Sequence, residues 1–406
     1  MASSQSQDIA SIQTKPSGKQ PQTSFQALKT TIVSSAHATH DTYSGFIAPL
    51  LPFLIDRMSL LKSEAALFLL FYQGMSILQP LIGHIGDRTN LRKYALLSPS
   101  ITGILLSLLS IAPNLPFGLL LCIVAGLSSA VMHATLPVIV THLSGDNLGK
   151  GMSIWMVGGT AGVMIGPLLI TLLITKASIN AIPFLMIPGI LMSIILSILL
   201  RNMPFHPSNN HGESARIPIR NLAAVMLPIM GFVVMRALVR AAPGSFLPIF
   251  LTESGSSLWF SGISLSVLQG FGIIGTILGG YLNDRHGFRM VMLISAIISS
   301  IALFAFSFSN GILQIISLGF LGIAIAMFLP VGMAVIQLSF PENRSLANGI
   351  YLALLFAINA LASVAAGFLY DHVGGQNTFI ISAGIGLLAI PFIYLMPYDK
   401  KRTESC

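Results

Sequence analysis

Long apolar stretches separated by short polar breaks occupy most of the chain, from about Leu28 to Pro397. A helix needs about 20 apolar residues to cross the roughly 30 Å hydrocarbon core of a bilayer, and these stretches reach that length. The pattern therefore predicts an all-α integral membrane protein with twelve transmembrane helices. The expected helices are 28–55, 64–84, 92–112, 115–143, 148–174, 180–200, 220–251, 258–282, 290–309, 311–339, 345–370 and 376–397.

Segments of a different composition mark the ends and the middle of the chain. Residues 201–219 are rich in Pro, Asn, His and Ser, which is typical of a linker. They separate a predicted N-terminal six-helix bundle, residues 24–200, from a C-terminal bundle, residues 220–398. Residues 1–23 and 399–406 are predicted tails, and the first tail lacks the apolar core and cleavage site of a signal peptide.

The two halves of the chain repeat one another. Leu51-Pro52 is matched by Leu247-Pro248, and Gln73-Gly74 by Gln269-Gly270, both 196 residues later. A longer match links the segments Gly83-His84-Ile85-Gly86-Asp87-Arg88 and Gly280-Tyr281-Leu282-Asn283-Asp284-Arg285. Several pairs at nearly one offset predict two pseudo-symmetric six-helix bundles, an architecture typical of transporters.

The repeated loop motif carries a resemblance to a known family. Two copies of Gly-x-x-x-Asp-Arg followed by a basic residue resemble the loop signature of the major facilitator superfamily, which implies the major facilitator fold and a gating role. The first copy departs from the signature at Asn90, whereas the second has the usual glycine at Gly287. The residues to which the resemblance assigns a gating role are Gly83, Asp87, Arg88, Arg92, Gly280, Asp284, Arg285 and Arg289.

Glycine in this motif is expected to permit close helix approach, and the carboxylate to face a helix N-terminus. The alternative is an ordinary charged turn. The predicted fifth helix carries a further glycine stripe at Gly158, Gly162 and Gly166-Pro167. It resembles the exporter motif of the same superfamily, although such stripes also serve plain helix packing.

Composition and charge agree with a membrane protein. The chain is 54% hydrophobic and 8% charged, whereas soluble domains carry about 25% charge. Most of its 21 Lys and Arg residues lie in the tails and even-numbered loops. The positive-inside rule therefore predicts cytoplasmic termini, and the net charge of +8 needs no nucleic-acid partner. Cys122 and Cys406 provide no disulfide framework.

A few charged residues lie inside predicted helices, where charge is costly unless it faces a cavity or a partner. Asp41 is placed at mid-depth in the first helix and shares a helical face with His37 and His40. Arg236, at the repeat position of His40, lies at mid-depth in the seventh helix, with Arg240 one turn beyond. These side chains are expected to face a common interior.

We expect Asp41, with His37 or His40, to carry protons. The residues predicted to bind a small anionic or amphipathic substrate are Arg236, Arg240, His133, Met327 and Met333. Each has a structural alternative: a core histidine bonded to a neighbour, an arginine reaching toward the interface, or a structural ion pair between Asp41 and Arg236.

Within the superfamily, His37-x-x-x-Asp41, Pro49 and His133 after Ser128-Ser129 resemble the fosmidomycin-resistance efflux family. The chain departs from that family at Ala134-Thr135, where a Pro-Glu pair is usual. The resemblance implies proton-coupled export. Simple electrostatics favours symport, because an anion that draws Arg236 away from Asp41 favours protonation of that carboxylate.

Two further function classes use the same side chains. A transition-metal exporter could use His37, His40, Asp41 and His133 as ligands, although Arg236 counts against a bound cation. A membrane-embedded enzyme lacks any accompanying nucleophile or phosphate-loop motif. We expect no enzymatic activity, no cofactor and no resident metal. The expected protein is a monomer of the bacterial cytoplasmic membrane whose partners are a small-molecule substrate, protons and lipid.

Overall fold

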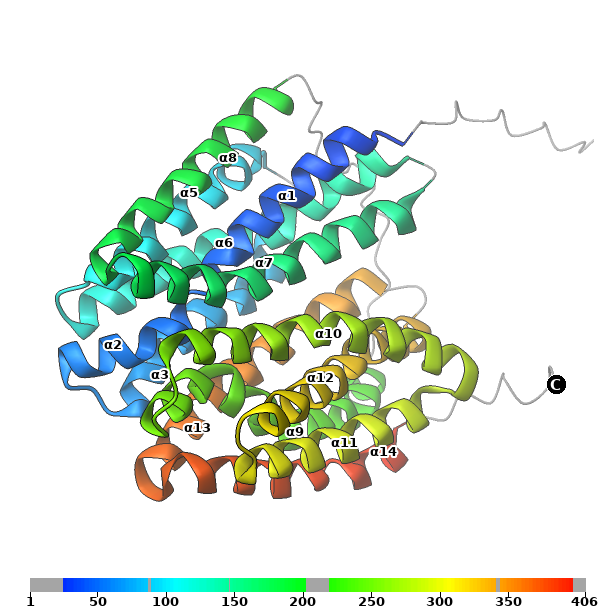
Figure 1. Cartoon of the computed structure of the whole chain (residues 1–406). Coiled ribbons are helices and arrows are strands. Elements are labelled where there is room, and N and C mark those ends of the chain that lie inside the picture. The colour runs from blue at the N-terminus through cyan, green and yellow to red at the C-terminus, as the bar shows by residue number, and fades with distance from the viewer. Residues whose placement is uncertain (1–24, 87–88, 146, 202–218, 341–343, 397–406) are drawn as a thin grey trace, which may run out of the picture.

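The chain folds into helices throughout the part that the structure describes (Figure 1). The computed structural model describes residues 25–86, 89–145, 147–201, 219–340 and 344–396. The predicted tails, nearly all of the linker, Asp87 and Arg88 lie outside these ranges, and the predicted bounds of the two bundles stay predictions.

The first half contains eight α-helices and three short 3₁₀ segments. They are α1 (Ala27–Ser44), α2 (Ile47–Met58), α3 (Lys62–Gly74), η1 (Met75–Leu78), α4 (Gln79–Gly86), α5 (Arg92–Leu108), η2 (Leu109–Ile111), α6 (Leu115–Ser144), α7 (Leu148–Lys176), η3 (Ile179–Leu185) and α8 (Met186–Leu199). The second half contains α9 (Ile219–Glu253), α10 (Leu258–His286), α11 (Phe288–Phe308), α12 (Ile312–Ser339), α13 (Arg344–Leu387) and α14 (Ile390–Leu395).

These helices account for the predicted membrane spans. Ten described segments are long and apolar enough to cross a membrane. One of them, Ala347–Leu395, has 49 residues and would be about 74 Å long as a single helix, enough for two crossings. Gly374 interrupts α13 with a φ of 77°, a conformation that favours glycine, so the eleventh and twelfth spans meet there. The first span, formed by α1 and α2, completes twelve.

The prediction of one continuous first helix was wrong. It is broken at Gly45 and Phe46, between α1 and α2. Pro49 has no backbone N–H, so it cannot donate the helical hydrogen bond to Gly45. A side chain at Gly45 would also meet Gly166 and Pro167 of α7 at 3.1 Å. The break therefore reflects both a missing donor and close packing on α7.

The helices form two bundles that meet mainly along three helix pairs. In the first half α1 packs on α7 and α5 on α6 and α8; in the second half α9 packs on α13 and α12 on α10 and α11. The halves meet where α3 contacts α13, α7 contacts α10 and α2 contacts α9. An offset of 196 maps α3 onto α10 and α7 onto α13. The first two contacts are therefore equivalent under the repeat.

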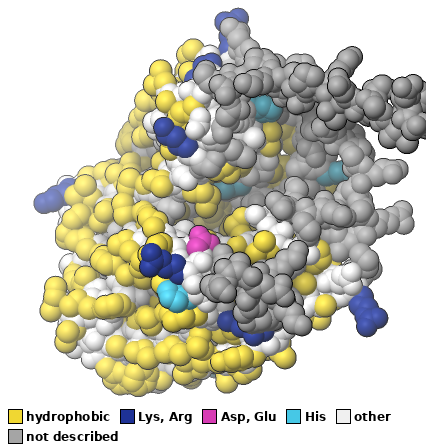
Figure 2. All heavy atoms as spheres, turned by 90° about the vertical axis from the view of Figure 1, so that its right-hand side faces the viewer, with side chains coloured by type: hydrophobic (Ala, Val, Ile, Leu, Met, Phe, Trp, Pro, Cys, Tyr) yellow, Lys and Arg dark blue, Asp and Glu magenta, His cyan; other side chains and the backbone are white. Residues whose placement is uncertain are grey.

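Two opposite ends of the bundles differ. The linker face is the end where α1 begins, α8 ends and α9 begins; the closed face is the end that carries Lys62 and Asp371. Figure 2 looks onto the linker face and shows a surface hollowed between the two bundles, with hydrophobic side chains on the flanks. Large apolar side chains such as Ile198 and Ile312 are more than 70% exposed, as expected for a surface that contacts lipid.

Candidate functional site

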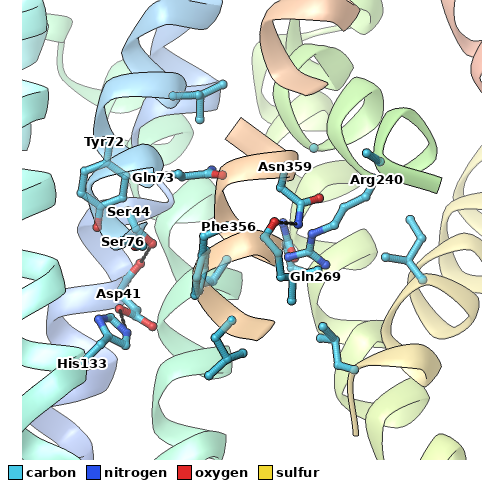
Figure 3. Close-up of a pocket in the computed structure, with 18 of the residues that line it drawn as sticks. Asp41, Ser44, Tyr72, Gln73, Ser76, His133, Arg240, Gln269, Phe356 and Asn359 are labelled. Atoms are coloured by element: carbon cyan, nitrogen blue, oxygen red, sulfur yellow. Dashed lines mark hydrogen bonds and ion pairs between the residues drawn. The ribbon is translucent and has the colours of Figure 1, made fainter. Parts of the chain in front are cut away.

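A cavity of about 410 Å³ lies between the two bundles. Five of the residues predicted to carry protons or bind substrate line it: Asp41, His133, Arg236, Arg240 and Met333. Asp41 and His133 stand on the wall of the first bundle, and Arg240 stands across the cavity on the second (Figure 3). The structure therefore brings together side chains that are about 200 residues apart in the sequence.

One prediction for this wall was wrong. Met327 does not line the cavity that the described residues form; its side chain is 3% exposed and packs in the core of the second bundle. Its neighbour Phe328 lines the cavity instead. Successive residues of a helix point about 100° apart, so a small error in the assumed face exchanges one residue for the next.

Asp41 is the centre of a buried cluster of three histidines. The Oδ2 atom of Asp41 is 3.1 Å from His37 Nε2, and Oδ1 is 2.9 Å from His40 Nδ1 and 3.6 Å from His133 Nε2. His37 and His40 lie behind Asp41, away from the cavity, whereas His133 shares the cavity wall with it. The predicted polar strip of the first helix is therefore continued by His133 of α6.

Backbone carbonyl groups fix which ring nitrogen carries a proton in two of these histidines. His37 Nδ1 donates to the carbonyl of Trp155 at 2.9 Å, and His133 Nδ1 donates to the carbonyl of Ser129 at 2.9 Å. A neutral imidazole with a proton on Nδ1 has a lone pair on Nε2. The two Nε2 atoms nevertheless lie 3.2 Å apart. A proton between them, or another cation, is needed to make that contact attractive.

Helix α7 supports the cluster from behind. The ring of Trp155 stacks on that of His37 with centroids 3.8 Å apart. The predicted glycine stripe faces α1: added Cβ atoms at Gly158, Gly162 and Gly166 would collide with the carbonyl oxygens of Ser34, Ala38 and Thr42, respectively. The stripe therefore serves close packing of α7 on the helix that carries Asp41.

Arg236 points into the second bundle more than into the cavity. Its side chain is buried, and its Nη2 atom is 3.1 Å from Ser299 Oγ, 3.4 Å from the Ser295 carbonyl and 3.5 Å from the Ala324 carbonyl. No ion pair joins it to Asp41 among the described residues. The charge of Arg236 is thus held by neutral groups of α11 and α12.

Arg240 is the more accessible guanidinium. It is exposed to the cavity, and Figure 3 shows its side chain pointing between Gln269 of α10 and Asn359 of α13. Gln73 of α3, the repeat partner of Gln269, lines the same cavity. These glutamines were not among the predicted site residues. Their repetition at equivalent positions of the two halves was the sequence feature that could have indicated them.

On the closed face, a polar network joins the bundles. Asp371 accepts hydrogen bonds from the backbone amides of Lys62 at 2.8 Å and Ser63 at 2.9 Å, and from Ser63 Oγ at 2.6 Å. Lys62 Nζ is 3.1 Å from Glu253, which also accepts a 2.6 Å bond from Tyr370. We call these five residues the closed-face latch. No local sequence pattern indicates this network, because Lys62 and Asp371 are 309 residues apart.

The gating motif lies at the linker face. Arg289 donates to the Met396 carbonyl at 3.1 Å, and Arg285 lies over the Tyr281 ring. The expectation of close helix approach was wrong for this conformation, because a Cβ atom added at Gly83 or Gly280 meets no described atom within 4 Å. Both glycines therefore face open space among the described atoms in this conformation.

A membrane-spanning protein of two repeated bundles around a polar cavity has the architecture of a secondary transporter. The family model of the Major Facilitator Superfamily matches residues 33–282 and 229–405, and the chain belongs to that family. It is thus a multi-pass membrane transporter of a small-molecule substrate and not an enzyme. Both the predicted fold class and the resemblance are confirmed.

Similar proteins extend over nearly the whole chain. The chain is 26% identical to the uncharacterized MFS-type transporter YfnC of Bacillus subtilis, over 92% of this chain and 93% of that protein. It is 23% identical to the fosmidomycin resistance protein of Escherichia coli, over 89% and 91%. The relatives therefore agree with the fosmidomycin-resistance resemblance.

Solved structures share the fold at lower identity. A bacterial homolog of the human lysosomal transporter Spinster, in an inward-facing and unoccupied conformation, has a TM-score of 0.74 at 16% identity, covering 93% of this chain and 97% of that one. The inward-open xylose transporter XylE of Escherichia coli has a TM-score of 0.72 at 14% identity, covering 93% and 98%.

Proposed function

We propose that the protein is a proton-coupled secondary transporter that exports a small anionic or amphipathic organic compound by alternating access. The observation that carries the proposal is the buried cluster of Asp41 with His37, His40 and His133, which opens onto the same cavity as Arg240. Export is supported by the likeness to the fosmidomycin resistance protein of Escherichia coli.

Orientation follows from the charge distribution. The linker face is cytoplasmic in this proposal, because most Lys and Arg residues of the chain belong to that side. The cavity then opens inward and the closed-face latch seals the outer side. Reversal of this arrangement would release substrate outward. The protein acts as a monomer in the bacterial cytoplasmic membrane.

Asp41 carries the coupled proton together with the histidines. The proton occupies the space between His37 Nε2, His133 Nε2 and the Asp41 carboxylate, where three acceptor atoms converge. His40 holds the Asp41 carboxylate from the other side and is itself 3.1 Å from Thr102 Oγ1. Substrate and proton thus bind on opposite walls of one cavity, which couples their binding.

Proteoliposomes with an imposed pH gradient test this proposal, with fosmidomycin and phenylphosphonate as probe substrates. Uptake driven by an acidic interior indicates antiport, whereas uptake driven by an acidic exterior indicates the symport alternative. Asp41→Asn is expected to abolish gradient-driven uptake but retain substrate exchange. Asp56→Asn, at an exposed acid outside the cavity, is the matched control. Unchanged gradient-driven uptake in Asp41→Asn would remove Asp41 from the mechanism.

A second candidate function is export of a transition-metal ion. One ligand atom from each of His37, Asp41 and His133 can be chosen so that all lie within 4.8 Å of one another. The two Nε2 atoms are 3.2 Å apart, and ligands 2.0–2.1 Å from a tetrahedral zinc ion stand about 3.3 Å apart. Thermal stabilisation by Zn²⁺ that is lost in a His37→Ala and His133→Ala double variant would favour this alternative.

A further inference from the structure

The central cavity adjoins a second, smaller pocket of about 120 Å³. We propose that this side pocket binds the oxyanion head group of the transported substrate, with Arg240 as its main ligand. The inference rests on the transport function proposed above and names the part of the cavity that recognises substrate. The polar side chains that line the side pocket are Gln73, Arg240, Ser245, Gln269, Asn359 and Ser363.

Arg240 brings an uncompensated positive charge to this pocket. No carboxylate lines the side pocket, and Arg240 has no hydrogen-bond or ion-pair partner within the described ranges. A charge inside a membrane protein is costly unless a partner or water compensates it. A substrate oxyanion would supply that partner, because the planar guanidinium presents two parallel donors to two oxygens.

Amide groups complete the site without adding charge. Gln73 reaches it from α3 of the first bundle and Gln269 from α10 of the second, at positions 196 residues apart. The amide nitrogen of Asn359 already donates to the Leu355 carbonyl at 2.8 Å. The two glutamines, one from each bundle, are therefore the neutral hydrogen-bond donors for a head group. A ligand held by both would respond to relative movement of the bundles.

The side pocket and the main cavity suit two chemically different parts of one substrate. Gly244 lines the side pocket, and a Cβ atom added there meets no described atom within 4 Å, so there is room for a compact group such as a carboxylate or phosphonate. The main cavity carries the bulky apolar side chains Phe356 and Met333, which suit an aromatic or aliphatic body. The expected substrate class is thus an amphipathic organic anion whose head group lies at Arg240.

The sequence predicted both Arg236 and Arg240 as anion ligands, and this assignment gives the main contact to Arg240. Arg236 is 7% exposed, and its Nη2 atom is already within hydrogen-bond distance of Ser299 and two carbonyl oxygens. Its Nε atom has no hydrogen-bond partner among the described residues, but it is buried, so an anion would have to enter the packed second bundle to reach it. Arg240 requires no such entry, because its guanidinium already stands in the cavity.

The test measures binding to the purified full-length protein, with phenylphosphonate as the anionic probe and benzamide as a neutral probe. Arg240→Met is expected to weaken phenylphosphonate binding at least tenfold and leave benzamide binding unchanged. The Gln73→Leu and Gln269→Leu double variant should weaken phenylphosphonate binding about fivefold. Arg236→Met, one helical turn away, is the matched control and should have a smaller effect than Arg240→Met.

Each outcome decides the proposal. A larger loss in Arg236→Met than in Arg240→Met, or an equal loss of benzamide binding, overturns it. If Arg240→Met fails to fold, Arg240→Lys is used instead, because it keeps the positive charge but lacks the two parallel donors of the guanidinium. Unchanged phenylphosphonate affinity in Arg240→Lys also overturns the proposal. Binding needs no vesicle or gradient. If the protein binds phenylphosphonate through Arg240 but transports nothing in proteoliposomes, the proposed function is refuted and the proposed binding role of the side pocket is not.

Discussion

Arg236 occupies in the second bundle the place that His40 occupies in the first. The two residues are 196 positions apart, and each reaches into its own bundle. His40 contacts Thr102, which in turn donates to Ser128; Arg236 contacts Ser299 and the Ala324 carbonyl. Ser299 and Ala324 follow Thr102 and Ser128 by 197 and 196 residues. The repeat has preserved a contact between three helices while the side chains changed.

This equivalence predicts that Arg236 stabilises the second bundle mainly by filling space. Arg236→Ala should lower the free energy of unfolding by about 2–4 kcal/mol, because it leaves a cavity among α9, α11 and α12. Arg236→Met should recover most of that loss, since no buried carboxylate is left unpaired. Thermal unfolding of the purified variants measures both. Equal destabilisation by Ala and Met would show that the charge itself holds the bundle.

The closed-face latch predicts which substitution opens the outer side. Asp371→Asn removes the negative charge that holds two backbone amides and the hydroxyl of Ser63. Hydrogen bonds to charged groups contribute about 1.5–3 kcal/mol, so the ratio of molecules closed at this face to molecules open there should fall at least about tenfold. Pulsed EPR between spin labels at Ser59 and His372, in a background without Cys122 and Cys406, should then show a longer distance.

A control separates the latch from nearby charge. The Lys62–Glu253 pair is partly exposed, with side chains 27% and 48% accessible, and such pairs contribute about 0–1 kcal/mol. Glu253→Gln should therefore change the spin-label distance less than Asp371→Asn does. An unchanged distance in Asp371→Asn, or a larger change in Glu253→Gln, would contradict the assignment of Asp371 as the main latch residue.

The sequence predicted the features that depend on local pattern or on the repeat. Hydrophobic runs indicated the spans, and the offset of 196 indicated two equivalent bundles. Asp41 was identifiable because an acid at mid-depth must face a cavity or a partner. Its placement beside His37 followed from helical geometry, since residues four apart share a face. These inferences needed no knowledge of tertiary contacts.

The remaining features depend on contacts between distant segments. Asp371 meets Ser63 across 308 residues, and no local pattern indicates that pairing. The proposal of Arg240 rather than Arg236 as the main anion ligand depends on where α11 and α12 place neutral acceptors around Arg236. Gln73 and Gln269 were visible as a repeated pair, but the sequence alone did not say that they share a cavity.

Close packing of α7 on α1 predicts a strong effect of a single methyl group. In Gly162→Ala the new Cβ would collide with the Ala38 carbonyl, so the two helices must separate. We expect the free energy of unfolding to fall by about 1–3 kcal/mol, as for overpacked cores. The control is Gly384→Ala, where the added Cβ meets nothing within 4 Å and helix propensity improves. Equal thermal midpoints for the two variants would refute the packing role.

The gating glycines predict an effect on transport without an effect on stability. Gly83 and Gly280 have open space around an added Cβ in this conformation, among the described atoms. A Gly83→Leu and Gly280→Leu double variant should therefore keep the wild-type thermal midpoint and probe binding. Alternating access requires the linker face to close, and two leucines there would obstruct the approaching helices.

Uptake by the double variant in proteoliposomes is expected to fall at least tenfold, whereas Gly384→Leu, at an exposed glycine of α13, should leave it unchanged. A wild-type uptake rate would show that these glycines do not approach another helix at any stage of the cycle. A lowered thermal midpoint would show instead that they already pack closely in the conformation with the open linker face.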